Sequence, residues 1–166
     1  HHRPEPPKTF DEPYLWLPKQ ADNSARGQVW VPKGQWGAVG GHMLHLSYGK
    51  AALFKVMKEN VDGVWQGGIV KFPLKFVSDI CRARFHPIDG QLYVAGLRGW
   101  QTDSARDACL QRVGYTGGQV DMPRDLRVSE EGVMITFTSP VDRSAAADVE
   151  NYAIEQWNYV WSKEYG

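Results

Sequence analysis

The chain has 166 residues, 42% of them hydrophobic, and its 19 basic and 19 acidic side chains give a formal net charge of zero. This balance excludes the electrostatic footprint of a nucleic-acid-binding protein or of one that binds anionic membranes. No apolar run approaches the roughly 20 residues that cross a bilayer, so we expect no membrane span. The length is sufficient to bury a hydrophobic core.

Residues 1–13 are rich in proline and charge, which predicts an extended lead. The opening His1-His2 is compatible with a purification-tag remnant. Because the chain starts without methionine or a charged-then-apolar leader, we expect its true N-terminus to lie upstream, and a signal for export cannot be read from it.

Residues 14–72 alternate short apolar runs with polar or glycine-rich turns, the spacing of an all-β region. Strands are predicted at residues 14–17, 28–31, 43–48, 51–58 and 68–72. The run 51–58 is also compatible with a helix, because its apolar residues fit a period of 3.6. Turn signals at Gly49 and at Asp62-Gly63 favour a strand, since they leave only about 8–12 residues between turns.

The stretch 80–101 has the clearest pattern in the chain. Its alternating run 81–86 ends at Pro87, and Asp89-Gly90 supplies the tight reversal into a second run at 91–97. A third run follows at 109–115. We expect three consecutive antiparallel strands, which would make most of one β-propeller blade.

The pattern changes after Gly118. Residues 119–127 are interpreted as a linker, residues 133–138 as an alternating strand, 145–148 as one helical turn and 151–157 as a further strand. Residues 128–166 are similar to the opening strands of bacterial immunoglobulin-like modules, which need roughly 100 residues for a sandwich. We therefore expect an excised piece of a longer protein, with residues 133–138 in a separate sheet.

Three motifs resemble a known family. They are Arg-x-Arg-Phe-His-Pro-x-Asp-Gly-Gln-Leu-Tyr-Val at 82–94, Gly-Leu-Arg-Gly-Trp-Gln-Thr at 96–102 and Gln-Arg-Val-x-Tyr-Thr-Gly at 111–117. Together they resemble the last propeller blades of large secreted bacterial proteins related to soluble quinoprotein sugar dehydrogenases, many of which carry c-type cytochrome domains. The likeness spans residues 16–118.

The resemblance implies an all-β fold: antiparallel meander sheets as partial β-propeller blades over residues 14–118, followed by an incomplete immunoglobulin-like β-sandwich. It also implies an extracellular or periplasmic location, pyrroloquinoline quinone (PQQ) and calcium as cofactors, and the remainder of the parent propeller, carbohydrate and a cytochrome c domain as partners. The same propeller occurs in active and inactive members, so the fold does not fix the function.

Two functions follow as alternatives. One is a fragment of a secreted sugar or alcohol dehydrogenase that passes electrons to a cytochrome and is inactive by itself. The other is a non-catalytic propeller and immunoglobulin-like unit that binds carbohydrate or holds neighbouring domains.

Arg82, Arg84 and Arg98 are the candidate cofactor-binding residues. An unpaired guanidinium on the inner strand of a blade would be costly, so each must be paired, exposed or used on a ligand. Pairing with Asp79, Asp89, Asp103 or Asp107 is the favoured interpretation. Binding an anionic cofactor such as a quinone carboxylate is the other.

Trp36, Trp65 and Trp100 each lie near glycine, in predicted loops, and are the candidate substrate-binding residues. An aromatic face on a loop suits stacking against a sugar ring. Packing between blades explains the same residues and is favoured.

Histidines and carboxylates indicate no metal site. On a strand, His42 and His45 would point to opposite faces, which argues against a two-histidine metal site. His86 is expected to pack or cap the turn, and no histidine can be assigned as a catalytic base. Asp103 and Asp107 are a weak calcium signal, because they lack the spaced oxygen ligands of a calcium loop.

Cys81 and Cys109 do not form the Cys-x-x-Cys-His run that attaches haem. On non-neighbouring strands, they are expected to be two buried small side chains rather than a disulfide. The glycine-rich loop 34–41 matches neither the dinucleotide fingerprint nor the P-loop, which argues against a nucleotide site.

Overall fold

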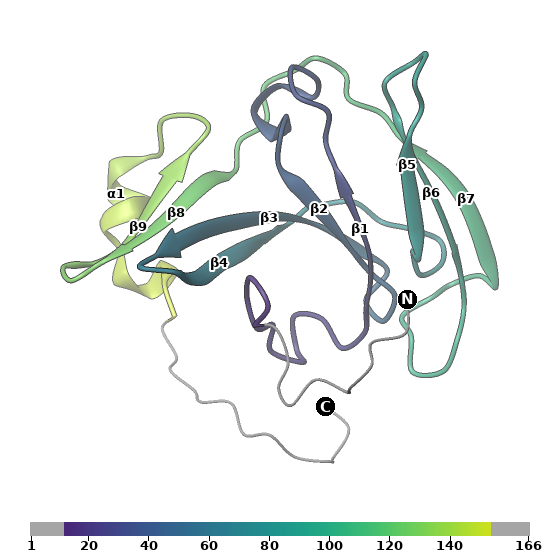
Figure 1. Cartoon of the computed structure of the whole chain (residues 1–166), viewed down its shortest axis with the longest axis horizontal. Coiled ribbons are helices and arrows are strands. Elements are labelled where there is room, and N and C mark those ends of the chain that lie inside the picture. The colour runs from purple at the N-terminus through teal and green to yellow at the C-terminus, as the bar shows by residue number, and fades with distance from the viewer. Residues whose placement is uncertain (1–11, 154–166) are drawn as a thin grey trace, which may run out of the picture.

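The computed structural model describes residues 12–153, and nearly all of the regular secondary structure within them is antiparallel β-sheet (Figure 1). Sheet 1 contains β1 (Ala25–Trp30), β2 (Met43–Ser47), β3 (Ala52–Val61) and β4 (Val64–Lys71). Sheet 2 contains β5 (Arg82–Phe85), β6 (Leu92–Leu97) and β7 (Ala108–Val113), and a hairpin contains β8 (Pro123–Ser129) and β9 (Gly132–Phe137). The expected all-β fold is confirmed.

Sheet 1 follows the chain in the order β1-β2-β3-β4 because each connection reverses direction locally. The turn from β3 to β4 is the tightest, with Asp62 at φ 50° and Gly63 at φ 89°. Two successive positive φ values match the right-handed twist of a hairpin and favour these residue types. The run 51–58 is therefore a strand, as the turn signals predict.

The inner face of sheet 1 packs against sheet 2. On the inner face, Leu44, Leu46 and Leu53 are completely buried. They pack with Ile80, Ala83, Leu92 and Val94 of the sheet 2 region in the main hydrophobic core. The core thus lies between the two sheets.

The outer face of sheet 1 carries the alternate residues of the same strands. The register pairs Gln28 with His45 and Trp30 with Met43 across β1 and β2, and Met43 with Val56 across β2 and β3. Partners directly opposite in a ladder point to the same side of a sheet. Lys58, two residues beyond Val56, lies on this outer face as well.

The three-stranded meander expected around the Asp89-Gly90 turn is confirmed. β5 pairs with β6 and β6 with β7, all antiparallel. Gly90 has φ 65°, which is the left-handed conformation that the reversal requires. The strands are one or two residues shorter than predicted at several ends.

The hairpin β8–β9 forms its own sheet, so the expectation that residues 133–138 leave the sheet of β7 is confirmed. The expected linker at 119–127 is wrong in its second half, because β8 begins at Pro123. The Nζ atom of Lys55 donates to the carbonyls of Pro123 at 2.8 Å and Arg124 at 2.6 Å. These bonds fasten β8 against β3.

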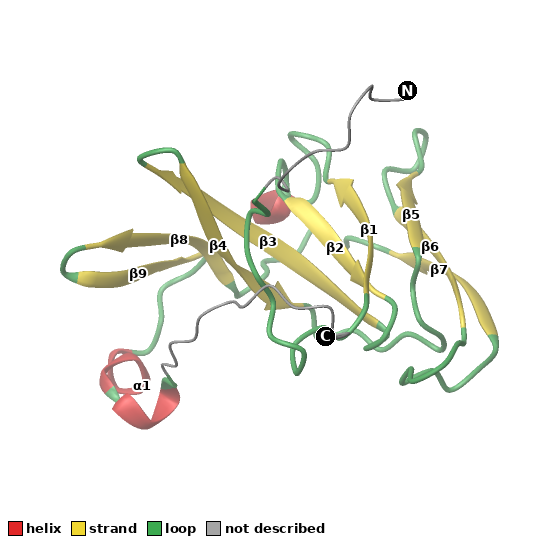
Figure 2. Cartoon of the chain, turned by 60° about the horizontal axis from the view of Figure 1, so that its bottom comes forward, coloured by secondary structure: helices red, strands yellow, loops and turns green. Residues whose placement is uncertain are grey.

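Two further expectations fail near the ends of the described chain. Residues 14–17 form no strand and cross the outer face of sheet 1 as an irregular segment (Figure 2). Their apolar side chains cover this face of the sheet, whereas their backbone does not pair in a ladder. Asn151 ends the short helix η2 (Val149–Asn151) instead of starting a strand, and residues 154–157 lie outside the described residues. The expected helical turn is present as α1 (Arg143–Ala147), which Asp142 caps.

Candidate functional site

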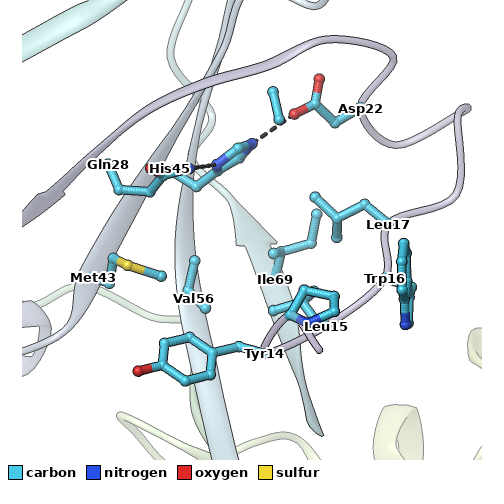
Figure 3. Close-up of a pocket in the computed structure, with 12 residues that line it drawn as sticks. Tyr14, Leu15, Trp16, Leu17, Asp22, Gln28, Met43, His45, Val56 and Ile69 are labelled. Carbon is cyan, nitrogen blue, oxygen red and sulfur yellow. Dashed lines mark hydrogen bonds and ion pairs between the residues drawn. The ribbon is translucent and has the colours of Figure 1, made fainter. Parts of the chain in front are cut away.

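A pocket of about 580 Å³ lies between the outer face of sheet 1 and residues 13–17, which we call the covering segment (Figure 3). Strands β1 to β4 all contribute to its floor, and Tyr14 and Trp16 contribute aromatic rings from the covering segment. The full lining is Pro13, Tyr14, Leu15, Trp16, Leu17, Asp22, Ala25, Gln28, Met43, His45, Val56 and Ile69. Its volume and mostly apolar lining are those of a small-molecule site.

The polar part of the pocket is a chain of hydrogen bonds centred on His45. The Nε2 atom of His45 lies 2.6 Å from Oδ2 of Asp22, and its Nδ1 atom lies 3.3 Å from Nε2 of Gln28. Ser47 donates its hydroxyl to Oδ1 of Asp22 at 2.7 Å. Asp22 and His45 are buried, whereas Gln28 is exposed.

The environment of Asp22 favours its charged form. Burial alone would raise the pKa of this carboxyl, but hydrogen bonds from His45, Ser47 and the backbone N–H of Ser24 outweigh burial and lower the pKa below its ordinary value. The carboxylate is therefore ionised at neutral pH and serves only as an acceptor.

The partners of His45 assign its tautomer. Since the Asp22 carboxylate can only accept, Nε2 of His45 carries a proton and donates it. Nδ1 then accepts from the Gln28 amide in the neutral ring. The Gln28 amide also has a second N–H and a carbonyl oxygen, with which it can hydrogen-bond a ligand hydroxyl while it holds the His45 ring in place.

The three candidate arginines lie elsewhere, and they do not meet in this pocket. Arg82 and Arg84 are exposed on β5, where each donates to the carbonyl of the residue before it. Arg98 is exposed after β6, with Nη1 4.0 Å from Oδ1 of Asp107. Within residues 12–153, the expected pairing with aspartate is present for Arg98 alone, at the long distance of 4.0 Å. Quinone binding by the three arginines stays a prediction.

The candidate tryptophans occupy three different environments. Trp36 is buried, donates from Nε1 to the Gly90 carbonyl at 2.9 Å and meets Phe85 edge-on at 5.1 Å, so it packs the core. Trp65 lies on β4 rather than in a loop, with its ring 4.8 Å from that of Tyr14. Trp100 is 82% exposed in a loop.

The remaining candidates are dispersed. His86 accepts from the backbone N–H of Asp89 at 3.3 Å, in agreement with a turn cap. Asp107 is exposed, and the backbone of Asp103 bonds to Gly49. Among residues 12–153 there is no group of three or more His, Cys, Asp or Glu that could hold a metal, and Cys81 and Cys109 are free, partly buried thiols.

Sequence reasoning missed the Asp22–His45 pair. It compared His45 only with His42, its neighbour in the chain, whereas the partner that matters lies 23 residues earlier in a polar loop. The one available signal is that a histidine on the apolar run 43–48 needs a buried hydrogen-bond partner.

The fold and the pocket define an all-β protein with a ligand-sized cavity on the outer face of its four-stranded sheet. Comparison with protein-family models, with curated proteins and with solved structures finds no match to this chain. In the part of the chain that the structure describes, no helix is long and apolar enough to cross a membrane.

Proposed function

We propose that this chain binds a sugar in the pocket under the covering segment, as a non-catalytic part of a secreted propeller protein of the quinoprotein sugar dehydrogenase type. The observation that carries the proposal is the combination of aromatic walls with a hydrogen-bonded pair of polar side chains. Tyr14 and Trp16 offer rings for the C–H face of a sugar, and Gln28 with His45 offers hydrogen bonds for its hydroxyls.

The arrangement of sheet 1 supports the propeller part of the proposal. A propeller blade has four antiparallel strands, and β1 to β4 are four antiparallel strands in chain order. Sheet 2 contributes a second meander of three strands against the same core. The fold alone does not assign the ligand, so the sugar is argued from the pocket.

The test is to titrate a panel of aldoses into the full chain and to measure binding by isothermal titration calorimetry. We expect at least one aldose to bind, and Gln28→Ala to weaken it by about tenfold, the effect of losing about 1.4 kcal/mol of binding energy. Trp100→Ala is the matched control, because this exposed ring is not part of the pocket. Absence of binding by every aldose would overturn the proposal, as would equal weakening in Trp100→Ala.

The Asp22–His45 pair favours a second function, a contribution to sugar or alcohol oxidation. A histidine oriented by a buried carboxylate and facing a cavity is suited to accepting a proton from a hydroxyl. PQQ and calcium would supply the hydride acceptor and its positioning, as the resemblance implies. The described residues assign neither of these cofactors a site: the three arginines do not converge.

An activity assay separates the two functions. The chain is incubated with PQQ, calcium, the aldose panel and an artificial electron acceptor. We expect no turnover above the cofactor blank if the role is binding only. Turnover that His45→Ala abolishes and Trp100→Ala leaves intact would assign the chain to catalysis and replace the non-catalytic proposal.

A further inference from the structure

An aromatic cage surrounds an ammonium group on the outer face of sheet 1. The Nζ atom of Lys58 lies 4.8 Å from the ring centroid of Tyr14, 5.0 Å from that of Trp65 and 5.1 Å from that of Trp30. All three distances are within the roughly 6 Å over which an aromatic ring attracts a cation. Because the rings come from the covering segment, β4 and β1, only the tertiary structure brings them together.

Electrostatic attraction to the rings, rather than an ion pair, holds this ammonium. Among residues 12–153, none of the ion pairs within 4.0 Å involves Lys58. The next carboxylate along β3, that of Glu59, accepts instead from Gln66 and from the backbone of Val128. The cage therefore selects for positive charge by its π faces, and among residues 12–153 no acidic side chain is paired with the ammonium.

The cage is also open to an incoming ligand. Trp30 is 51% exposed and Trp65 is 41% exposed, and Lys58 is exposed at the end of a long flexible side chain. No hydrogen bond anchors the Lys58 ammonium within the described part of the chain. Among the contacts of the described residues, leaving the cage costs this side chain its three ring contacts.

We propose that Tyr14, Trp30 and Trp65 form a binding site for a methylated ammonium cation, with Lys58 as its built-in competitor. A primary ammonium keeps much of its hydration, whereas a trimethylammonium group presents its methyl groups to three rings at once. This chemistry is shared by small choline-like molecules and by trimethylated lysine side chains. The site goes beyond sugar binding: it shares Tyr14 with the pocket, but Trp30, Lys58 and Trp65 do not line it.

Competition from Lys58 leads to a quantitative prediction for the affinity of the site for choline. If Lys58 fills the cage for about four-fifths of the time, the apparent affinity of the full chain is reduced about fivefold. Choline is titrated into the full chain and into Lys58→Ala, and binding is followed by tryptophan fluorescence and by the upfield shift of the choline methyl protons. We expect Lys58→Ala to bind choline about fivefold more tightly, and Lys58→Arg to remain as weak as the unchanged chain.

Three controls decide the outcome. In the Lys58→Ala background, Trp65→Ala should weaken choline binding by at least about tenfold. If the Trp65→Ala variant does not fold, Trp30→Leu is tested in its place. Trp100→Ala in the same background should leave binding unchanged, and 3,3-dimethylbutan-1-ol, the uncharged analogue of choline, should not bind. A trimethyllysine peptide that binds more tightly than choline would identify a protein side chain as the source of the cation; the reverse would identify a small molecule.

Two results would overturn the site. The first is no choline binding by a folded Lys58→Ala variant, as judged by an unchanged near-ultraviolet circular dichroism spectrum. The second is equal binding of choline and its uncharged analogue, which would leave only an apolar contact. Loss of aldose binding in Gln28→Ala with choline binding retained would separate this site from the sugar pocket.

Discussion

The Nε2 atom of His45 lies 2.6 Å from Oδ2 of Asp22, and neither side chain is significantly exposed to solvent. The same carboxylate also accepts from Ser47 and from the backbone of Ser24. One ionised group thus satisfies three donors and ties the loop before β1 to the outer face of β2. The loop is also held through its backbone, where the N–H of Tyr48 donates to the Ser24 carbonyl at 2.9 Å.

We expect Asp22→Asn to lower the free energy of unfolding by about 1–3 kcal/mol, because the amide turns one acceptor into a donor that faces other buried donors. Chemical denaturation at neutral pH measures this loss. Ser47→Ala, which removes one of the donors and leaves the charge, is the milder comparison and should cost about 1 kcal/mol. An Asp22→Asn variant as stable as the unchanged chain would contradict the role of the carboxylate.

The same carboxyl should make stability depend on acid. Its pKa in the folded chain is lowered below the ordinary 3.8, so its contribution is fully present above that value and is lost as the pH falls through the folded pKa. Between about pH 7 and about pH 3, the unchanged chain should lose more stability than Asp22→Asn. Parallel losses in the two proteins would rule out this linkage.

Lys55 should make stability depend on pH in the alkaline range, with the same sign as Asp22: stability rises as the pH rises. Its side chain is completely buried, and burial lowers its pKa from 10.5 to about 8. Between these two values the unfolded chain binds a proton that the folded chain does not, so the free energy of unfolding rises with pH. The full shift corresponds to roughly 3 kcal/mol.

The measurement compares Lys55→Met with the unchanged chain at several pH values from about 7 to about 10. Other lysines and tyrosines titrate in both proteins, and their contribution cancels in the difference. The unfolding free energy of the unchanged chain minus that of Lys55→Met should increase as the pH rises. A difference that is flat with pH would show that Lys55 keeps its ordinary pKa.

Truncation of Trp36 should lower the stability strongly, whereas truncation of Trp100 should hardly change it. Trp36 fills the core and donates to Gly90, so Trp36→Ala should cost about 3–5 kcal/mol. Trp100→Ala should change stability by less than about 0.5 kcal/mol, because its ring is largely in solvent. Thermal melting of both variants checks this. Similar losses would show that Trp100 packs against something as well.

Gly96 should tolerate no side chain. A Cβ atom at this position of β6 would overlap the backbone oxygen of Asp79, which cannot move without shifting the segment that leads into β5. Gly96→Ala is expected to reduce folded yield severely and to lower the melting temperature. Gly114→Ala is the matched control, since the nearest atom to its Cβ is a side-chain oxygen at 3.7 Å. Equal tolerance at both positions would contradict the close approach.

Local chemistry in the sequence was sufficient to predict most of the strands. The Asp89-Gly90 and Asp62-Gly63 pairs have the residue types that positive φ values need, and alternation on either side marks the paired runs. Such signals act over a few residues, so they are visible without the fold. They failed for residues 14–17, where an apolar pattern fits a segment that covers a sheet as well as one that joins it.

The sites required the tertiary structure, because their members are distant in the chain. Twenty-three residues separate Asp22 from His45, and the rings around Lys58 come from three segments that only the folded sheet aligns. Residue types and their periodicity determined that the chain is all-β with short meanders. Which polar group is buried beside which ring depends on how the sheet faces are covered, and that long-range packing leaves no local pattern in the sequence.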